Sequence, residues 1–207
     1  MKRAILTGFE PFGPYKYNPV QDTAIEYNRK ILGDIEIIGL VLPCTYYGAF
    51  KLLSEKIDAL SPDIIIGSGL ASRIQRIRLE AFGRNVMNGK YPDNEGRKAD
   101  NEPIIKDGNL LYQTNSNSIL LASALYDLGI SSEVSIDAEG FICNSLIYLT
   151  AKKISDENLP IKFAFFHTPW TEDYLDKVDL EPEKVTIKKN NLRRTIEILV
   201  RNIERNM

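Results

Sequence analysis

The chain has 207 residues, of which 43% are hydrophobic and 26% charged, and its formal net charge at pH 7 is −2. These values predict one globular domain, 1–207, with a sizeable core, and they exclude the broadly basic surface that binds nucleic acid or anionic membranes. No apolar run approaches the ~18 residues of a membrane span, and the apolar stretch at the start is too short for a signal peptide. We therefore expect a cytoplasmic protein without nucleic-acid or membrane partners.

Short apolar segments recur along the chain, and their Ile, Val and Phe content is typical of strands buried on both faces. They alternate with segments of helical periodicity. This alternation predicts a single α/β domain with a mostly parallel central sheet and helices on both faces. A further stretch, 73–85, alternates in polarity and is expected to form an antiparallel edge strand. The apolar segments expected to form strands are 3–6, 35–43, 62–70, 133–138 and 161–169.

Besides the segment that contains Cys143, four segments have the spacing of apolar residues expected of helices. The first, 18–33, begins at Asn18 as the N-cap, has Pro19 in its first turn and is expected to end at Gly33. The segment 86–112 is polar and rich in turn residues, which indicates a functional connection, a hairpin extension or an oligomer contact. The other three expected helices are 46–60, 118–128 and about 190–205.

The chain contains only two cysteines, Cys44 and Cys143, and one histidine, His167. Their spacing gives neither a disulfide framework nor a metal site, so we expect no metal or other cofactor. His167 ends an apolar run, and active sites of open α/β sheets form at the carboxyl ends of strands. His167 is therefore either half-buried and satisfied by backbone groups or a general base and thiolate partner.

Cys143 follows an expected strand and stands in the first turn of a segment with helical spacing. The unpaired N–H groups and positive dipole end of a helix start favour the thiolate, and such N–H groups can also stabilise an oxyanion. The alternative is a small hydrophobic residue in the core, the commoner role of free cysteine. Cys44 is expected in the core or in a pocket wall.

A Cys–His pair requires a third group that orients the imidazole. Glu80 is a candidate, because it lies in an otherwise apolar and basic run and a buried carboxylate needs a partner. The local sequence alone favours a different interpretation, in which Glu80 is exposed on a strand and pairs with Arg78 or Arg84.

Residues 7–13, TGFEPFG, leave the first expected strand in a turn that carries two aromatic side chains, Phe9 and Phe12. The stretch lacks the glycine and lysine spacing of a phosphate-binding loop. The two phenylalanines are either walls of a small apolar pocket or core residues, and this stretch alone favours the core.

Several short motifs occur together in the order and spacing of one known family. They resemble the motifs of pyroglutamyl peptidase I, the pyrrolidone carboxyl peptidase family of cysteine peptidases. The resemblance extends from residue 5 to about residue 170, and the chain length also matches. The motifs are TGFEPFG at 7–13, NP at 18–19, LE at 79–80 ahead of YPDNEG, AEGFICN at 138–144 and FFHTP at 165–169.

This resemblance implies a cofactor-independent enzyme that hydrolyses the amide bond after an N-terminal pyroglutamyl residue. The catalytic glutamate, cysteine and histidine of the family fall on Glu80, Cys143 and His167. The resemblance therefore makes Glu80 the residue that orients the imidazole, which the local sequence does not.

The resemblance also implies how substrate is bound. The aromatic residues with which the family holds the pyroglutamyl ring fall on Phe9 and Phe12, and the asparagine near that site falls on Asn18. The implied partners are peptides with an N-terminal pyroglutamate. Family members assemble as homo-oligomers, often tetramers, so a homo-oligomer is implied here as well.

The sequence departs from the family near the reaction centre. Glu139 and Gly140 stand where a glycine and a threonine are common, and a carboxylate near the thiol is expected to raise its pKa. Lys90 replaces an arginine and keeps its charge but not its planar fork. These departures keep open a catalytically impaired relative that binds pyroglutamyl N-termini or small lactams. A phosphorylase-like α/β enzyme is a further alternative, although the sequence has no recognisable phosphate cradle.

Overall fold

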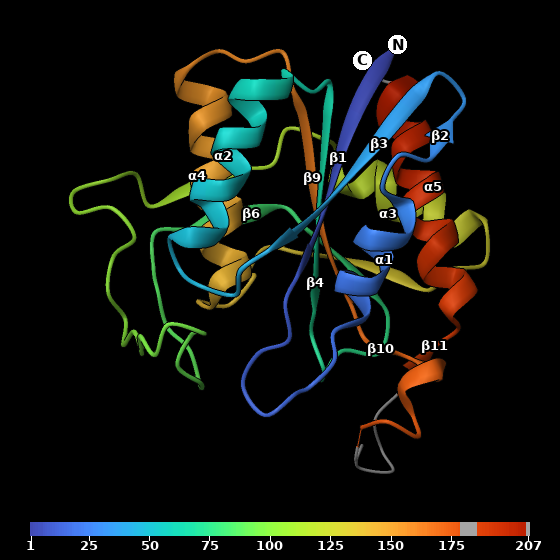
Figure 1. Cartoon of the computed structure of the whole chain (residues 1–207). Helices are drawn as coiled ribbons and strands as arrows, with labels where there is room; N and C mark the ends of the chain where they lie inside the picture. Colours follow the sequence, from blue (N-terminus) through green and yellow to red (C-terminus); the bar gives the residue numbers. More distant parts are fainter. Residues whose placement is uncertain (179–185, 206–207) are drawn as a thin grey trace.

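The computed structural model describes residues 1–178 and 186–205 and shows a single α/β domain built on a seven-stranded sheet (Figure 1). The expected fold class is confirmed. The strands of this sheet are β1 (Lys2–Phe9), β2 (Ile31–Leu32), β3 (Ile35–Leu42), β4 (Ile64–Leu70), β5 (Ile77–Glu80), β8 (Ser132–Ser135) and β9 (Lys162–Thr168).

The strands follow one another across the sheet in the order β2-β3-β1-β4-β9-β5-β8. The four central strands β3, β1, β4 and β9 run parallel. β5 runs antiparallel to β9 and parallel to β8. The reversed direction of β5 matters for function, because it brings the start of β5 to the edge where the parallel strands end.

Within the described residues, five α-helices cover the sheet in two layers. Figure 1 shows α2 and α4 on one face and α1, α3 and α5 on the other, and two separate hydrophobic clusters of buried residues fill the two interfaces. The helices are α1 (Pro19–Tyr27), α2 (Gly48–Leu60), α3 (Ser118–Asp127), α4 (Ile142–Asp156) and α5 (Lys189–Arg205).

The central strands are buried on both faces, as their apolar character predicts. In β4, Ile65 packs under α2 and α4, whereas Ile64 and Ile66 pack under the opposite helix layer. In β9, Phe165 and Phe166 divide between the two layers in the same way. This period of two is what places every second side chain of a strand on the same face.

The first helix is shorter than the sequence predicts. α1 ends at Tyr27 rather than at Gly33. Arg29 adopts a positive φ of 67° and donates its N–H to the Ile37 carbonyl at 2.7 Å. The chain then forms β2, which pairs with β3 through a turn at Gly33, also at φ 67°. Gly33 is therefore a hairpin residue and does not stop the helix.

The stretch 73–85 contains two strands where one was expected. β5 is antiparallel, as predicted, but it lies second from the edge, because β8 covers it. The remainder is β6 (Phe82–Arg84). β8 ends at Ser135, earlier than expected, because the Ser135 hydroxyl accepts the Asp137 N–H at 3.1 Å and the chain turns.

The polar segment 86–112 is a hairpin extension. The segment runs into β7 (Leu111–Gln113), which pairs antiparallel with β6. Within the extension, Met87 and Glu102 form an isolated antiparallel bridge. The remaining short elements are β10 (Trp170–Thr171), the 3-10 helix η1 (Glu172–Tyr174) and β11 (Thr186–Ile187).

Candidate active site

Glu80 and His167 meet across two neighbouring strands. Glu80 in β5 lies opposite Phe165 in β9, so the side chains of Glu80 and His167 share one face as a diagonal pair. Glu80 Oε1 and His167 Nδ1 are 2.7 Å apart. Glu80 is fully buried and His167 is 7% exposed. The carboxylate therefore holds the imidazole by one ring nitrogen and leaves Nε2 for other chemistry.

The interpretation of Glu80 that its local sequence favours is wrong. Arg78 pairs instead with Glu133 on β8, with Nε and Oε1 2.9 Å apart, and Arg84 pairs with Asp137 at 2.6 Å. Glu80 thus has neither arginine as a partner. The error has a physical reason, because the partner of Glu80 lies on β9, which is far away in sequence and comes next to β5 only in the folded sheet.

The thiol of Cys143 and the imidazole of His167 lie close to the same strand position. Cys143 is the second residue of α4, after the N-cap Phe141, which confirms its expected place in the first turn. A Cβ on Gly69 in β4 would lie 2.7 Å from Cys143 Sγ and 3.1 Å from His167 Nε2. Both groups therefore lie over a strand position where only glycine leaves room for them.

Asn144, the residue after the thiol, fixes the start of α4 to β6. Asn144 is fully buried. Its Oδ1 accepts the Arg84 N–H, and its Nδ2 donates to the carbonyls of Arg84 and Val86, all at 2.8 Å. β6 also approaches the helix closely at Gly83, where a Cβ would lie 2.3 Å from the Tyr148 nitrogen. The side chain of Asn144 thus acts as a strand partner for β6 and sets the position of Cys143.

Thr114 fixes the bend between β5 and β6. Its Oγ1 lies 3.2 Å from the carbonyl oxygens of both Glu80 and Ala81, and its N–H donates to Ala81 at 2.9 Å. Thr114 follows β7, so the hairpin extension returns to hold the backbone of Glu80. One short segment, from β5 to β6, therefore carries the carboxylate and also anchors the helix of the thiol.

Burial dominates the electrostatics of the thiol. It raises the pKa of Cys143 well above the usual value, and the negative charges of Glu80 and Glu139 add to the effect. The helix N–H group acts in the opposite direction and is outweighed. Burial likewise raises the pKa of Cys44 to about 12.

A cavity of about 800 Å³ opens over the Sγ of Cys143 and the imidazole. The aromatic residues Phe9, Phe12 and Phe141 line it, together with Cys44. The rings of Phe12 and Phe141 are 5.7 Å apart. Phe9 is 2% exposed and belongs to the core as well as to the wall, so both interpretations of the first loop hold for it. Cys44 is a buried wall residue, as expected.

Asn18 also lines this cavity, but its side chain is already engaged. Its Oδ1 accepts the Val20 N–H at 3.3 Å, which confirms the predicted helix cap, and its Nδ2 donates to the Glu10 carbonyl at 3.2 Å. Asn18 therefore holds the loop between Phe9 and Phe12 against the start of α1.

Several cavity residues were not singled out from the sequence. They include Phe141 and Tyr91. The buried Asn144, which follows Cys143 in α4, was not singled out either. Asn144 had a detectable signal, since it is a polar residue among apolar neighbours in the first turn of an expected helix. Glu139 and Lys90, two of the departures from the family, both line the cavity.

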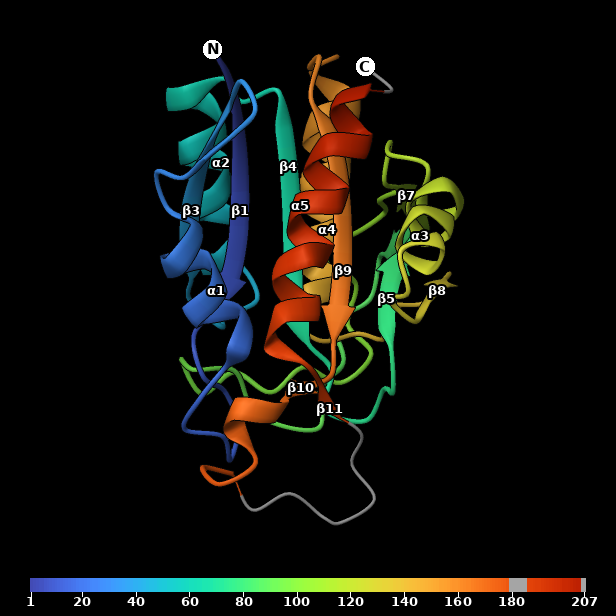
Figure 2. The ribbon, with the colours of Figure 1, turned by 90° about the vertical axis from the view of Figure 1, so that its right-hand side faces the viewer.

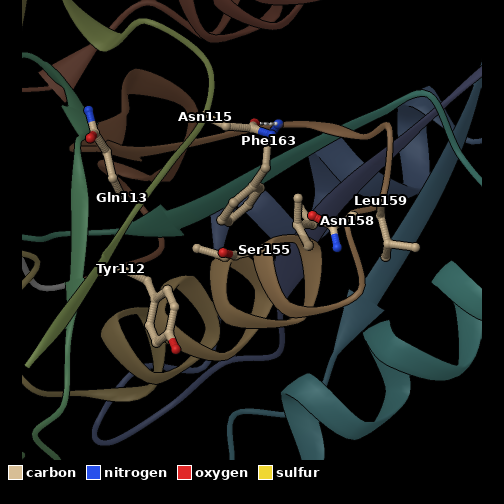
Figure 3. A pocket seen from close by; sticks show the side chains of 9 residues that line it. Tyr112, Gln113, Asn115, Ser155, Asn158, Leu159 and Phe163 are labelled. Atoms are coloured by element: carbon tan, nitrogen blue, oxygen red, sulfur yellow. Dashed lines mark hydrogen bonds between the residues drawn. The ribbon is translucent and has the colours of Figure 1, made fainter. Parts of the chain in front are cut away.

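A second cavity of about 520 Å³ lies at the other end of α4 (Figure 3). Figure 3 shows Tyr112, Phe163 and Ser155 among its lining side chains. The side-chain amide of Asn115 is already hydrogen-bonded there: its Nδ2 donates to the Ile161 carbonyl and its Oδ1 accepts the Phe163 N–H. None of the candidate catalytic residues reaches this cavity.

Residues 1–178 and 186–205 contain no cluster of three or more His, Cys, Asp or Glu side chains that could hold a metal ion. Within the same ranges, no helix has both the length and the apolar character needed to cross a membrane.

Known proteins resemble this chain over nearly its whole length. The family model "Pyroglutamyl peptidase" matches residues 2–202. A pyrrolidone-carboxylate peptidase of Thermococcus litoralis is 32% identical over 173 residues, 84% of this chain and 79% of that relative. A pyrrolidone-carboxylate peptidase of Bacillus mycoides is 30% identical over 200 residues, which are 97% of this chain and 92% of that relative. A mutant pyrrolidone carboxyl peptidase from Pyrococcus furiosus superimposes with a TM-score of 0.93 at 26% identity and covers 99% of both chains.

Proposed function

This chain belongs to the pyroglutamyl peptidase family of cysteine peptidases, and we propose that it hydrolyses the amide bond after an N-terminal pyroglutamyl residue with Cys143 as nucleophile. In this proposal His167 is the acid and base, and Glu80 orients it. The observation that carries the assignment is the 2.7 Å contact between Glu80 and His167, with Cys143 Sγ and His167 Nε2 together over Gly69.

The pocket chemistry supports pyroglutamate as the recognised group. Its ring is a small lactam without a charged amine, so it needs apolar walls and few polar partners. Phe9, Phe12 and Phe141 provide such walls. Asn18 stays a proposed substrate-binding residue, because its amide holds the loop of the two phenylalanines with one N–H and one lone pair and keeps a second of each beside the cavity.

The first step transfers the proton of the Cys143 thiol to His167 Nε2. The Glu80 carboxylate accepts a hydrogen bond from the Nδ1–H of His167 and in this way stabilises the imidazolium that forms. The sulfur attacks the carbonyl carbon between pyroglutamate and the next residue. The first N–H groups of α4, which have no partner within the helix, stabilise the oxyanion.

The second half of the reaction releases both products. His167 gives its proton to the leaving amine, the C–N bond breaks, and a thioester with Cys143 remains. Water then gives a proton to His167 Nε2 and its oxygen to the acyl carbon. Pyroglutamate leaves, and the thiolate takes the proton back from His167.

Release of a chromophore from a neutral pyroglutamyl anilide tests this proposal, with Cys143→Ala and Cys143→Ser beside the unchanged protein. We expect both variants to lose activity by about a thousandfold or more, because the nucleophile is gone. Activity that survives in Cys143→Ala would refute the mechanism. An inactive unchanged protein that still binds free pyroglutamate would favour the lactam-binding relative, which the position of Glu139 beside the thiol supports.

We further propose, from the family resemblance, that the peptidase domain spans 1–207 and acts in the cytoplasm as a homo-oligomer, such as a tetramer. Light scattering coupled to gel filtration measures the assembly directly. A single species with the 23.5 kDa mass of one chain would refute the oligomer.

A further inference from the structure

The strand order gives the cavity two chemically different sides. β1 and β3, with the loops that follow them, bring Phe9, Phe12 and Cys44 to one side. β5 and β8 lie on the other side, and β9 with His167 runs between the two (Figure 2). His167 therefore separates an aromatic side from the side formed by β5 and β8.

The β5 side carries a surplus of positive charge, which we call the arginine rim: Arg73, Arg76 and Arg78. Arg73 and Arg78 line the cavity. Arg78 lies directly opposite His167 in the strand register, on the same face of the sheet. Glu133 lies between Arg76 and Arg78, at 3.6 and 2.9 Å. Among the described residues Arg73 forms no ion pair, so the rim has three guanidinium groups and one carboxylate.

The other charged residues of the cavity are paired with partners of their own or offset one another. Asp137 is paired with Arg84 at 2.6 Å. Glu139 precedes α4 and Lys90 lies in the hairpin extension. Both line the wall, and neither forms an ion pair within residues 1–178 and 186–205. Their charges are opposite and offset each other in sum. Glu80 lines the cavity as well, so its charged groups balance in number: Arg73, Arg78 and Lys90 against Glu80, Asp137 and Glu139. Because Glu80 is held by His167 and Asp137 by Arg84, the guanidinium of Arg73 stays available to a bound peptide on the β5 side.

The proposed reaction fixes the direction of the substrate. If the pyroglutamyl ring lies among Phe9, Phe12 and Phe141, then His167 Nε2 must face the leaving amine. The chain beyond that amine then extends past His167 toward Arg78 and Arg73. This inference rests on the proposed function, because it takes the position of the ring from it.

We infer that the arginine rim selects pyroglutamyl peptides that present a carboxylate directly after the scissile bond. Two sources supply this chemistry, the free α-carboxylate of a pyroglutamyl dipeptide and the side chain of an aspartate or glutamate in the second position. Arginine suits both, because its planar fork matches a carboxylate. The expected preference is roughly threefold to tenfold in kcat/KM, the size of one or two partly exposed ion pairs.

Two matched substrate pairs measure the preference and distinguish its sources. Pyroglutamyl-alanine against its C-terminal amide reports on the α-carboxylate. Pyroglutamyl-glutamate amide against pyroglutamyl-glutamine amide reports on the side chain. We expect the anionic member of at least one pair to have the higher kcat/KM at low salt. The advantage should shrink in 1 M salt, where the screening length is about 3 Å. Equal values within both pairs overturn the inference.

Two variants connect the preference to the rim. Arg73→Gln removes an exposed, unpaired guanidinium and should lower the ratio in the preferred pair about two- to threefold. Arg201→Gln on α5 is the matched control, since it removes an exposed arginine far from the cavity and should leave the ratio unchanged. A ratio that both variants change equally, or that neither changes, overturns the role of the rim.

The neutral pyroglutamyl anilide separates this inference from the function on which it rests. If the unchanged protein does not hydrolyse the anilide or any of the four peptides, the proposed function fails. If it hydrolyses the anilide but treats the charged and neutral peptides alike, only the selection by the rim fails.

Discussion

The two ends of α4 border two cavities, and they differ in how their polar groups are used. At the C-terminal end, Asn115, Ser155 and Asn158 line the second cavity, and Asn115 is satisfied by backbone at the surface (Figure 3). At the N-terminal end, the partly exposed Cys143 lies beside the buried Glu80–His167 pair. The comparison teaches that a hollow becomes a candidate site through buried titratable groups held against one another, and not through volume alone.

The largest effect that this comparison predicts is that of Glu80→Gln. The amide keeps the shape of the side chain but removes the charge that stabilises an imidazolium, and it can bind the wrong tautomer of His167. We expect kcat to fall by about a thousandfold or more. Steady-state kinetics with the pyroglutamyl anilide measure the loss, and circular dichroism checks that the sheet is intact. A change below tenfold would show that His167 does not depend on Glu80.

A pair of asparagine variants compares the two ends of α4 directly. Asn144→Leu leaves backbone groups of Arg84 and Val86 without partners in a fully buried place, so we expect a loss of about 3 kcal/mol in the free energy of unfolding. Asn115→Leu removes two side-chain hydrogen bonds to backbone at the surface and should lower the free energy of unfolding by about 1 kcal/mol. Urea denaturation measures both values.

The activity of the two asparagine variants provides the sharper test. Asn144→Leu should lower kcat with little change in KM, because the thiol loses its position relative to His167. Asn144→Asp, which retains an acceptor, is not expected to restore kcat, because both carbonyls need a donor. Asn115→Leu should leave both constants unchanged. Equal losses of kcat in Asn144→Leu and Asn115→Leu would mean that α4 responds as a whole and that its N-terminal anchor has no special role.

The smallest effect concerns Glu139. Burial and nearby negative charge raise the pKa of Cys143, so the rate should rise with pH until the thiolate forms. Glu139→Gln removes one negative charge and therefore lowers this pKa, so the rise should shift to lower pH and the rate on its acidic side should increase a few-fold. Asp156→Asn, at the far end of α4, is the control. A shift to higher pH in Glu139→Gln would contradict the assignment.

A structural feature can be predicted from the sequence when the residues that cause it lie close together in the chain. The place of Cys143 in the first turn of a helix was predictable, because a strand, a turn and a helical pattern follow one another within 20 residues. The early end of α1 was not, because it depends on the bond between Arg29 and the Ile37 carbonyl across a hairpin. The burial of Glu80 came only from the family resemblance, since its partner lies on another strand.

The positioning residues show the same limit more strongly. Asn144 and Thr114 act through backbone groups of β5 and β6, about 60 and 34 residues away. From the sequence alone, a polar residue is equally consistent with an exposed helix face, with a turn and with a buried tertiary contact. A buried asparagine inside an apolar helical segment is nevertheless a signal, because an unsatisfied amide is costly in a core.

The place of β5 in the sheet has a consequence for the order of folding. β5 lies between β9 and β8, and both follow it in the chain. During synthesis on the ribosome, β5 therefore cannot pair in the sheet until β8 and β9 have been made. The partner of Glu80, His167, is synthesised 87 residues later. We expect the nascent chain to carry no working site, and peptide hydrolysis to begin only with the last long-range pairing of the sheet.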